Sequence, residues 1–239
     1  MAARPIAMLH FDAALQPFLA RARRGGPVAV EIDRSRSAKD AIESLGIPHT
    51  EVGRLAIDGR AARLEDLLRG GERVEVGACA SDGDAAQEPP SFVADTHLGK
   101  LARHLRLAGF DCLWRNDWED DALVAAAGAG ARIVLTRDKG VLRRRAVVRG
   151  RFVRATDSEA QLAEVLQAFG LRGSLRAFSR CRECNVALED VAKTAVEAAL
   201  PEKVRAHYAR FKRCPACGRV YWEGTHFARL RAVLERVAG

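Results

Sequence analysis

The sequence predicts an α/β protein built from three folded parts. Strand-like runs surround one helix at the N-terminal end, strand and helix signals alternate in the middle, and two cysteine pairs stand near the C-terminal end. With 239 residues, the chain is long enough for one large domain or for two to three small ones. We place the three parts at residues 1–78, 91–173 and 174–239, with a linker at 79–90.

The charge of the chain favours a polyanionic partner. It contains 39 Lys and Arg against 31 Asp and Glu, a formal net charge of +8. Residues 91–173 carry 14 basic and 10 acidic side chains, and residues 174–239 carry 13 and 7. This balance alone does not distinguish RNA from an acidic protein or a lipid surface. Because no apolar run approaches about 20 residues and no secretory signal is evident, we expect a soluble cytoplasmic protein without a membrane partner.

The N-terminal part has the pattern of a small α+β roll. Strand-like runs IAMLHF, PVAVEI, RLAIDG and ERVEV flank one helix, SAKDAIESLGI, with Ser37 as its N-cap and Gly46 as its stop. The Asp-Gly pair in RLAIDGRAARL predicts a hairpin turn. The closing run RGGERVEV resembles the last strand of a ubiquitin-like, or β-grasp, domain. Residues 77–91, rich in Ala, Gly, Asp, Ser and Pro, predict the linker.

The middle part alternates strands and helices in the manner of a parallel sheet flanked by helices. In its first helix Leu98, Leu101, Ala102 and Leu105 share one face, and Gly109 ends the helix. His97, Lys100 and His104 are predicted to face solvent. Open parallel sheets bind ligands outside the carboxyl ends of their strands, so acidic residues that follow apolar runs are the candidates for chemistry.

Three positions meet this condition. Asp95 follows FVA, Asp138 follows IVLTR, and Asp120 with Asp121 opens the helix after DCLWR. Converging carboxylates repel one another unless a divalent cation neutralises them, and hard oxygen ligands favour Mg²⁺ or Mn²⁺. The alternative for each aspartate is a helix N-cap or a turn. Capping fully explains Asp157, and the acidic loop RNDWEDD explains Asp117 without a ligand role.

A block of bases follows Asp138 in IVLTRDKGVLRRR. If Asp138 helps to hold a metal, these cations are placed to bind the phosphates of a nucleic acid that passes it. The alternative is a solvated basic helix face. The candidate RNA-binding residues are Lys100, Arg103, Arg137, Lys139, Arg143, Arg144 and Arg145, and the run continues with Arg149, Arg151 and Arg154.

The segments FVADTHLGKLARHLRLAGFD, RNDWEDDALVAAA and RIVLTRDKGVLRR resemble the PIN-like ribonuclease domain of the Mut-seven C-terminal RNase family, over residues 91–235 or so. Bacterial members of that family often carry a ubiquitin-like domain ahead of it. The resemblance implies a PIN-like fold and metal-dependent RNA cleavage, with Asp95, Asp120 and Asp138 in the acidic motif. It also implies a hydroxyl near the metal at Thr136, which a β-branched strand residue explains equally well, and leaves Asp157 as the match for a further acid.

Two Cys-x-x-Cys pairs predict a structural zinc site. Cys181, Cys184, Cys214 and Cys217 supply four thiolates across a 29-residue spacer that contains the helical segment ALPEKVRAHYARF. We therefore expect a zinc ribbon with an inserted helix, the alternative being two unrelated redox pairs. Tyr208, Phe211, Tyr221 and Trp222 lie among bases here, a pattern that suits RNA stacking or a ribbon core.

These observations favour a metal-dependent ribonuclease whose zinc ribbon and basic surface bind RNA, with tRNA and other structured RNA as candidate substrates. Two-metal chemistry predicts products with 5′-phosphate and 3′-hydroxyl ends. The alternative is a non-catalytic RNA- or ribonucleoprotein-binding module. In either case the ubiquitin-like domain is a candidate docking or regulatory site for a protein partner.

Overall fold

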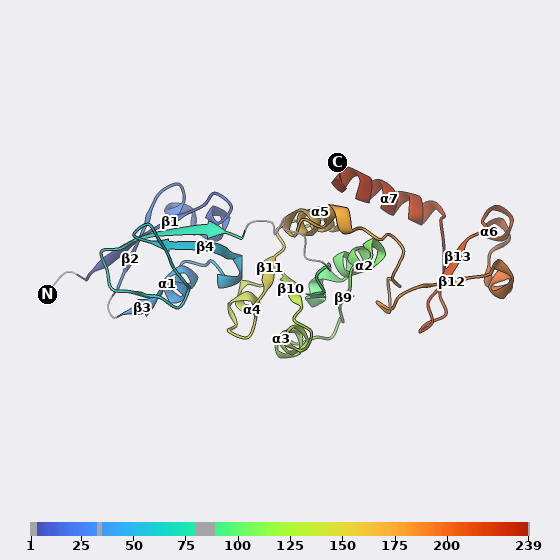
Figure 1. The fold of residues 1–239 in the computed structure, drawn as a ribbon, viewed down its shortest axis with the longest axis horizontal. Helices are drawn as coiled ribbons and strands as arrows, with labels where there is room; N and C mark the ends of the chain where they lie inside the picture. Colours follow the sequence, from blue (N-terminus) through green and yellow to red (C-terminus); the bar gives the residue numbers. More distant parts are fainter. Residues whose placement is uncertain (1–3, 33–34, 80–88, 239) are drawn as a thin grey trace. The chain divides into compact units, whose positions relative to one another are not determined.

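The computed structural model describes residues 4–32, 35–79 and 89–238 (Figure 1). The chain forms two compact units: Met1–Ala80 with Thr136–Phe152, and Ser81–Leu135 with Val153–Gly239. Most of the predicted linker, residues 80–88, lies outside the described residues. Within the described part of the chain, no helix is long and apolar enough to cross a membrane.

The first unit is built on a five-stranded mixed sheet of order β2-β1-β7-β4-β5. Its strands are β1 (Ile6–Phe11), β2 (Val28–Glu31), β4 (Val52–Ile57), β5 (Arg60–Ala61) and β7 (Arg73–Ala78). The central pair β1 and β7 is parallel, whereas the β1–β2, β4–β7 and β4–β5 pairs are antiparallel. The N-terminal residues also contain a short antiparallel pair of strands, β3 (Arg36–Ser37) and β6 (Leu67–Leu68). Their 3₁₀ turns are η1 (Gln16–Phe18), η2 (Arg21–Arg23) and η3 (His49–Glu51).

Local sequence chemistry sets the ends of the elements in this unit. Helix α1 (Ala38–Ser44) begins where the Ser37 hydroxyl accepts a 3.1 Å hydrogen bond from the backbone N–H of Asp40. It ends before Gly46, whose φ of +102° favours glycine. Asp58 and Gly59, with φ of +49° and +76°, turn β4 into β5. The predicted helix and the predicted hairpin are both confirmed.

Residues 136–152 pack with the N-terminal residues in this unit, and they contain α4 (Lys139–Arg143) and β11 (Gly150–Phe152). The Glu51 carboxylate, of which 1% is exposed, accepts a 2.6 Å hydrogen bond from the backbone N–H of Phe152 and pairs with Arg151 at 3.4 Å. The Phe152 ring lies edge-on to Phe18 with ring centroids 5.4 Å apart. A segment that follows Asp138 in the chain thus shares the core of the N-terminal sheet.

The second unit contains the parallel strands β8 (Phe92–Ala94) and β9 (Cys112–Leu113) and, as far as Leu135, β10 (Ile133–Thr136), which lie in the order β10-β8-β9. Phe92 and Ala94 belong to a core formed with α2 (Gly99–Ala108) and α5 (Ser158–Ala168). Val93, between them, points to the opposite face, where α3 (Asp120–Ala129) contacts β8. The sheet is therefore buried on both faces, as predicted for a parallel sheet flanked by helices.

The C-terminal residues of this unit form a three-stranded antiparallel sheet and a long helix (Figure 1). The strands are β12 (Glu189–Val191), β13 (Phe211–Arg213) and β14 (Val220–Trp222), in that order, with α6 (Glu202–His207) inserted between β12 and β13. Helix α7 (Thr225–Ala238) returns to pack on α2 and α5. Short 3₁₀ turns are η4 (Thr96–Leu98), η5 (Leu171–Ser174), η6 (Lys193–Ala195) and η7 (Glu197–Ala199).

Candidate functional site

Asp95 stands directly after β8 and caps the 3₁₀ turn that leads into α2. Its side chain, 13% exposed, accepts hydrogen bonds on Oδ1 from the Thr96 hydroxyl at 2.9 Å and from the backbone N–H of His97 at 3.3 Å. The His97 ring lies 3.2 Å from the same oxygen and is mostly exposed. The capping explanation therefore holds for Asp95, and its position at a strand end is also as predicted.

Asp138 is an exposed residue at the start of α4. Its Oδ1 accepts a 2.6 Å hydrogen bond from the backbone N–H of Gly140, so it too is an N-cap. The buried Thr136 hydroxyl accepts a 2.9 Å hydrogen bond from the backbone N–H of Asp138 and thereby shapes the turn between β10 and α4. Thr136 has a structural function whether or not a metal binds nearby.

The remaining acidic candidates differ in their surroundings. Asp120 and Asp121 are exposed in the first turn of α3, where the helix dipole favours negative charge. Asp157 caps α5 by accepting from the backbone N–H groups of Glu159 and Ala160, and these hydrogen bonds lower the pKa of Asp157. Asp117 makes a two-point ion pair with Arg115, at 2.9 and 2.8 Å, which lowers the pKa of Asp117.

Strand register relates the two strand-end aspartates. Ala94 pairs with Leu135 across the parallel strands β8 and β10, and the backbone N–H of Asp95 donates to the Leu135 carbonyl at 2.9 Å. Asp138 follows Leu135 by three residues along the chain. Asp95 and Asp120 belong to the second unit and Asp138 to the first, so the convergence of the three carboxylates stays a prediction.

The predicted RNA-binding bases fall into two groups. The first group is exposed and consists of Lys100, Arg137 and Arg145. In the second group, Arg103 stacks over Trp114 at 5.3 Å and pairs with Glu183, while Lys139 lies 5.1 Å from the Phe18 ring.

The surroundings of Lys139 disfavour its charged form. Burial, together with the charges of Arg143 and Arg24, lowers the pKa of Lys139. Arg143 and Arg144 are half-buried. Lys139 is therefore held mainly by the N-terminal residues of its own unit, and the exposed group is better placed to bind phosphate.

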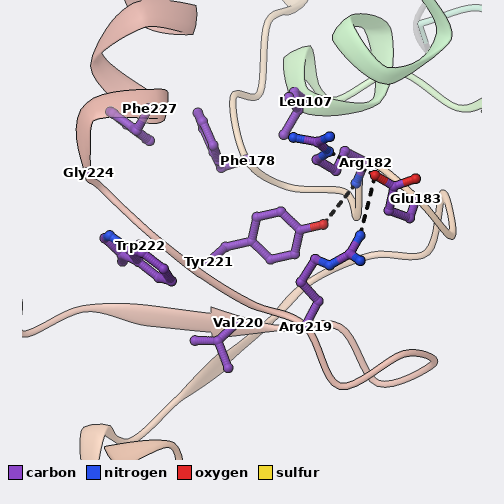
Figure 2. A pocket seen from close by; sticks show the side chains of 10 residues that line it. All are labelled: Leu107, Phe178, Arg182, Glu183, Arg219, Val220, Tyr221, Trp222, Gly224 and Phe227. Carbon is purple, nitrogen blue, oxygen red and sulfur yellow. Dashed lines mark hydrogen bonds and ion pairs between the residues drawn. The ribbon is translucent and has the colours of Figure 1, made fainter. Parts of the chain in front are cut away.

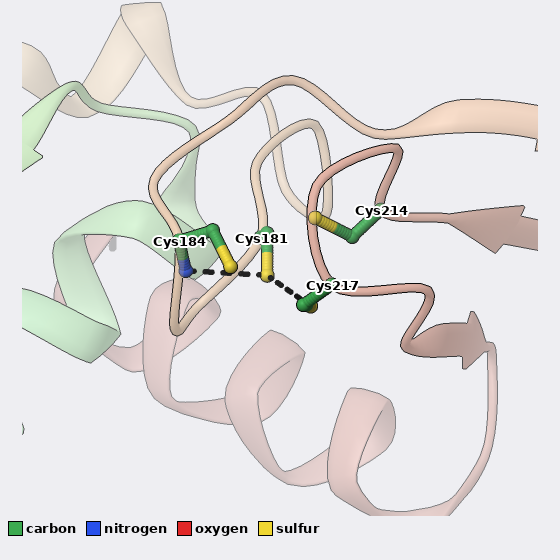
Figure 3. Close-up of side chains that lie close together, drawn as sticks. All are labelled: Cys181, Cys184, Cys214 and Cys217. Atoms are coloured by element: carbon green, nitrogen blue, oxygen red, sulfur yellow. Dashed lines mark hydrogen bonds between the residues drawn. The ribbon is translucent and has the colours of Figure 1, made fainter.

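Four cysteines in the second unit lie close enough together to hold a metal ion (Figure 3). The Sγ atoms of Cys181, Cys184, Cys214 and Cys217 all lie within 4.8 Å of one another, and Cys181 and Cys217 are 3.8 Å apart. Tetrahedral zinc with Zn–S bonds of about 2.3 Å requires neighbouring sulfurs about 3.8 Å apart. The donor set and its spacing therefore fit a metal such as zinc, with four ligands from the protein.

The two cysteine pairs adopt the same turn. Asn185 and Gly218 follow the second cysteine of each pair, with φ of +64° and +70°, and their backbone N–H groups donate to the carbonyls of Cys181 and Cys214 at 2.9 Å. Asparagine and glycine are the residues that tolerate this left-handed conformation best. Two matching turns that aim four thiols at one point are typical of a metal site and not of independent redox pairs.

Neighbouring groups favour a thiolate at one of these cysteines. The Tyr221 hydroxyl lies 3.1 Å from the Cys181 Sγ, and the backbone N–H of Cys184 donates to the same sulfur. Burial raises the pKa of Cys181, but these hydrogen bonds outweigh it and lower the pKa to about 7. Metal-bound cysteine is the thiolate, so this environment also suits a ligand.

Arg106 connects the first cysteine turn to the parallel sheet. Its guanidinium, with the residue 3% exposed, donates to the carbonyls of Cys112 at 2.8 Å, Arg182 at 3.0 Å and Glu183 at 2.8 Å. Asn185 adds a second connection, accepting from the backbone N–H of Cys112 at 3.1 Å. The cysteine turn thus covers the edge of β9.

Sequence reasoning missed both connecting residues. Nothing local distinguishes Arg106 from a surface base on an amphipathic helix. Asn185, by contrast, follows CREC as Gly218 follows CPAC, and this correspondence could have identified it.

Two family models match the chain. A model described as "Mut7-C RNAse domain" matches residues 90–234, and one described as "Mut7-C ubiquitin" matches residues 4–82. Searches of curated proteins and of solved structures found no match to the chain.

Proposed function

Because the chain belongs to the Mut7-C RNase family and carries that family's ubiquitin-like domain ahead of its RNase domain, we propose that it is a metal-dependent ribonuclease. The substrate is RNA, and the reaction is hydrolysis of a phosphodiester bond. The observation that carries this proposal is the pairing of Ala94 with Leu135, from which Asp95 and Asp138 follow at neighbouring strand ends.

The proposed site consists of Asp95, Asp120 and Asp138, with Asp121 beside Asp120. Carboxylate oxygens are the ligands that Mg²⁺ and Mn²⁺ prefer, so the donor chemistry fits these ions. When bound, such an ion lowers the pKa of a water molecule and stabilises the leaving oxygen of the displacement. Hydrogen bonds at Asp95 and Asp138 hold their carboxylates in position before RNA arrives.

We leave Asp117 and Asp157 out of the proposed site because Asp95, Asp120 and Asp138 match the family's acidic motif without them; Asp117 is held in an ion pair with Arg115, and Asp157 caps α5. The exposed bases Lys100, Arg137 and Arg145 bind the phosphates of the RNA. Zinc at the four cysteines has a structural function: with four protein ligands the site leaves no position for water or substrate.

The test is RNA cleavage by full-length protein with added Mg²⁺ or Mn²⁺ and by its Asp95→Asn and Asp138→Asn variants. Asparagine is as good an N-cap as aspartate, so both variants keep the cap and lose only the charge. We expect each to lose about 100-fold or more in kcat, since a metal ligand contributes several kcal/mol to transition-state stabilisation. The matched control is Asp190→Asn, an exposed carboxylate on β12 paired with Lys212, and it should cleave normally.

A second candidate function is RNA binding without cleavage. It is favoured by the fact that Asp95 and Asp138 each cap a helical turn and so have a structural reason to be acidic. Folded wild-type protein that binds RNA with steep salt dependence, yet leaves it intact with either metal, would support this function in place of the nuclease.

A further inference from the structure

A pocket of about 370 Å³ lies in the second unit, where Arg182 and Glu183 of the first cysteine turn help to line it (Figure 2). Four aromatic side chains contribute to its wall: Phe178, from the loop before the first cysteine turn, Tyr221 and Trp222 from β14, and Phe227 from α7. Arg182 and Arg219 also line it. The volume falls in the lower part of the range of about 300–1,000 Å³ that is usual for small-molecule sites.

The aromatic rings are held in place before any ligand binds. Phe178 and Phe227 stack with centroids 4.3 Å apart and planes at 30°. The Tyr221 hydroxyl is fixed between the Cys181 sulfur, at 3.1 Å, and the backbone N–H of Arg182, at 3.2 Å. Rigid rings of this kind can stack a planar ligand with little loss of side-chain entropy.

Gly224 gives the Trp222 indole its room. A Cβ at position 224 would lie 2.6 Å from the indole Nε1, closer than atoms can approach. The backbone after β14 therefore passes the tryptophan ring at a distance that only glycine allows. Trp222 is half-buried.

Basic side chains gather around one carboxylate beside the pocket. Glu183 pairs with Arg182 at 3.0 Å and with Arg219 at 3.3 Å, and Arg103 approaches its other oxygen at 3.4 Å. One carboxylate thus faces three guanidinium groups. The side chains of Arg182 and Arg219 are 45% and 52% exposed, so both can reach an anion in solution. Guanidinium groups bind phosphate with two parallel hydrogen bonds.

We propose that this pocket binds one nucleotide of single-stranded RNA, with the base among the aromatic rings and the phosphate at Arg182 and Arg219. Proteins usually bind single-stranded RNA by stacking its bases on aromatic rings and by contacting its phosphates, and both kinds of contact tolerate different base sequences. The proposal rests on the proposed function only in that RNA is the substrate. The proposal also gives the cysteine cluster a second function. The cluster holds the turn that carries Arg182, and the Tyr221 hydroxyl on β14 bonds to that turn.

The test uses full-length protein with adenosine or uridine 5′-monophosphate as the probe. Saturable quenching of tryptophan fluorescence is expected, and it should disappear in Trp222→Phe, which keeps an aromatic ring in the wall. Arg182→Gln with Arg219→Gln should raise Kd about tenfold or more. The matched control is Arg231→Gln, which removes an exposed arginine paired with Glu235 on α7 and should leave Kd unchanged.

Zinc content and circular dichroism establish that each variant is folded. The proposal is overturned if quenching persists in Trp222→Phe. It is also overturned if the double arginine variant has the same Kd as Arg231→Gln. In either case a protein contact becomes the better explanation of the pocket. Cleavage of RNA by the wild-type protein is measured separately. Nucleotide binding without any cleavage would overturn the ribonuclease alone, and cleavage without nucleotide binding would overturn the pocket alone.

Discussion

Replacing Arg106 by methionine should destabilise the second unit more than any surface substitution. The arginine stem is retained in methionine, but the guanidinium that donates to three backbone carbonyls is lost. A buried acceptor left without a donor costs about 1–3 kcal/mol. Three acceptors give an upper range of about 3–9 kcal/mol, and water can reach the carbonyls of the partly exposed Arg182 and Glu183. We therefore expect a loss of about 3–5 kcal/mol, in the lower part of that range.

The assay is equilibrium unfolding of full-length protein in guanidinium chloride with zinc in excess, followed by circular dichroism. Arg231→Met is the control, because its exposed ion pair with Glu235 contributes about 0–1 kcal/mol. Arg106→Lys should lie between the two, since one ammonium group cannot reach three carbonyls at once. A loss below about 1 kcal/mol for Arg106→Met would show that the connection between α2 and the cysteine turn does not stabilise the fold.

Three further outcomes are expected. Glu51→Gln should destabilise the first unit by about 3–5 kcal/mol, because it removes the buried carboxylate of an ion pair and leaves the half-buried Arg151 without its charged partner; unfolding measurements on the full chain check this, and an unchanged midpoint would contradict it. Burial opposes ionisation of Asp111, but the hydrogen bonds from Arg132 and Asn185 prevail and lower the pKa of Asp111 below its ordinary value. The stability that Asp111 contributes should therefore be present above about pH 4 and be lost as the pH falls further, and Asp111→Asn should flatten this acid limb of an unfolding-against-pH curve. Cys214→Ser should reduce bound zinc from one ion per chain and lower the melting temperature, as measured by elemental analysis and calorimetry; full zinc content would refute four-cysteine ligation.

The sequence predicted those features that local chemistry determines. Ser37 and Gly46 bound a helix, Asp58 and Gly59 make a hairpin turn, and Gly109 ends α2 with a φ of +104°. Each depends on one residue's capping ability or backbone freedom and needs no distant partner. The spacing of the cysteine pairs is equally local, and the thiols come together as predicted.

Sequence patterns did not predict the long-range packing. The bases after Asp138 look alike in sequence, yet Lys139 is half-buried beside Phe18 whereas Arg145 is exposed. Arg106 has the helical spacing of a surface base and is buried because a turn 76 residues away places its carbonyls there. Such partners are chosen by the tertiary fold and leave no periodic signal.

The acidic residues show how one observation can support two interpretations. Asp95 and Asp138 both follow strands, as catalytic carboxylates in parallel sheets do, and both cap the turns that begin there. Capping and metal binding use different lone pairs of a carboxylate, so a cap does not exclude a ligand. Measuring whether the protein cleaves RNA distinguishes the two interpretations.

The most direct test of the ribonuclease is therefore the end chemistry of its products. Labelled single-stranded RNA is incubated with full-length protein and Mn²⁺ or Mg²⁺, and with the folded Asp138→Asn variant, and the termini of the fragments are determined. We predict 5′-phosphate and 3′-hydroxyl ends that appear only with added metal and only when Asp138 is present. Fragments with 2′,3′-cyclic phosphate, or undiminished cleavage by Asp138→Asn, would contradict a metal-dependent reaction at this site.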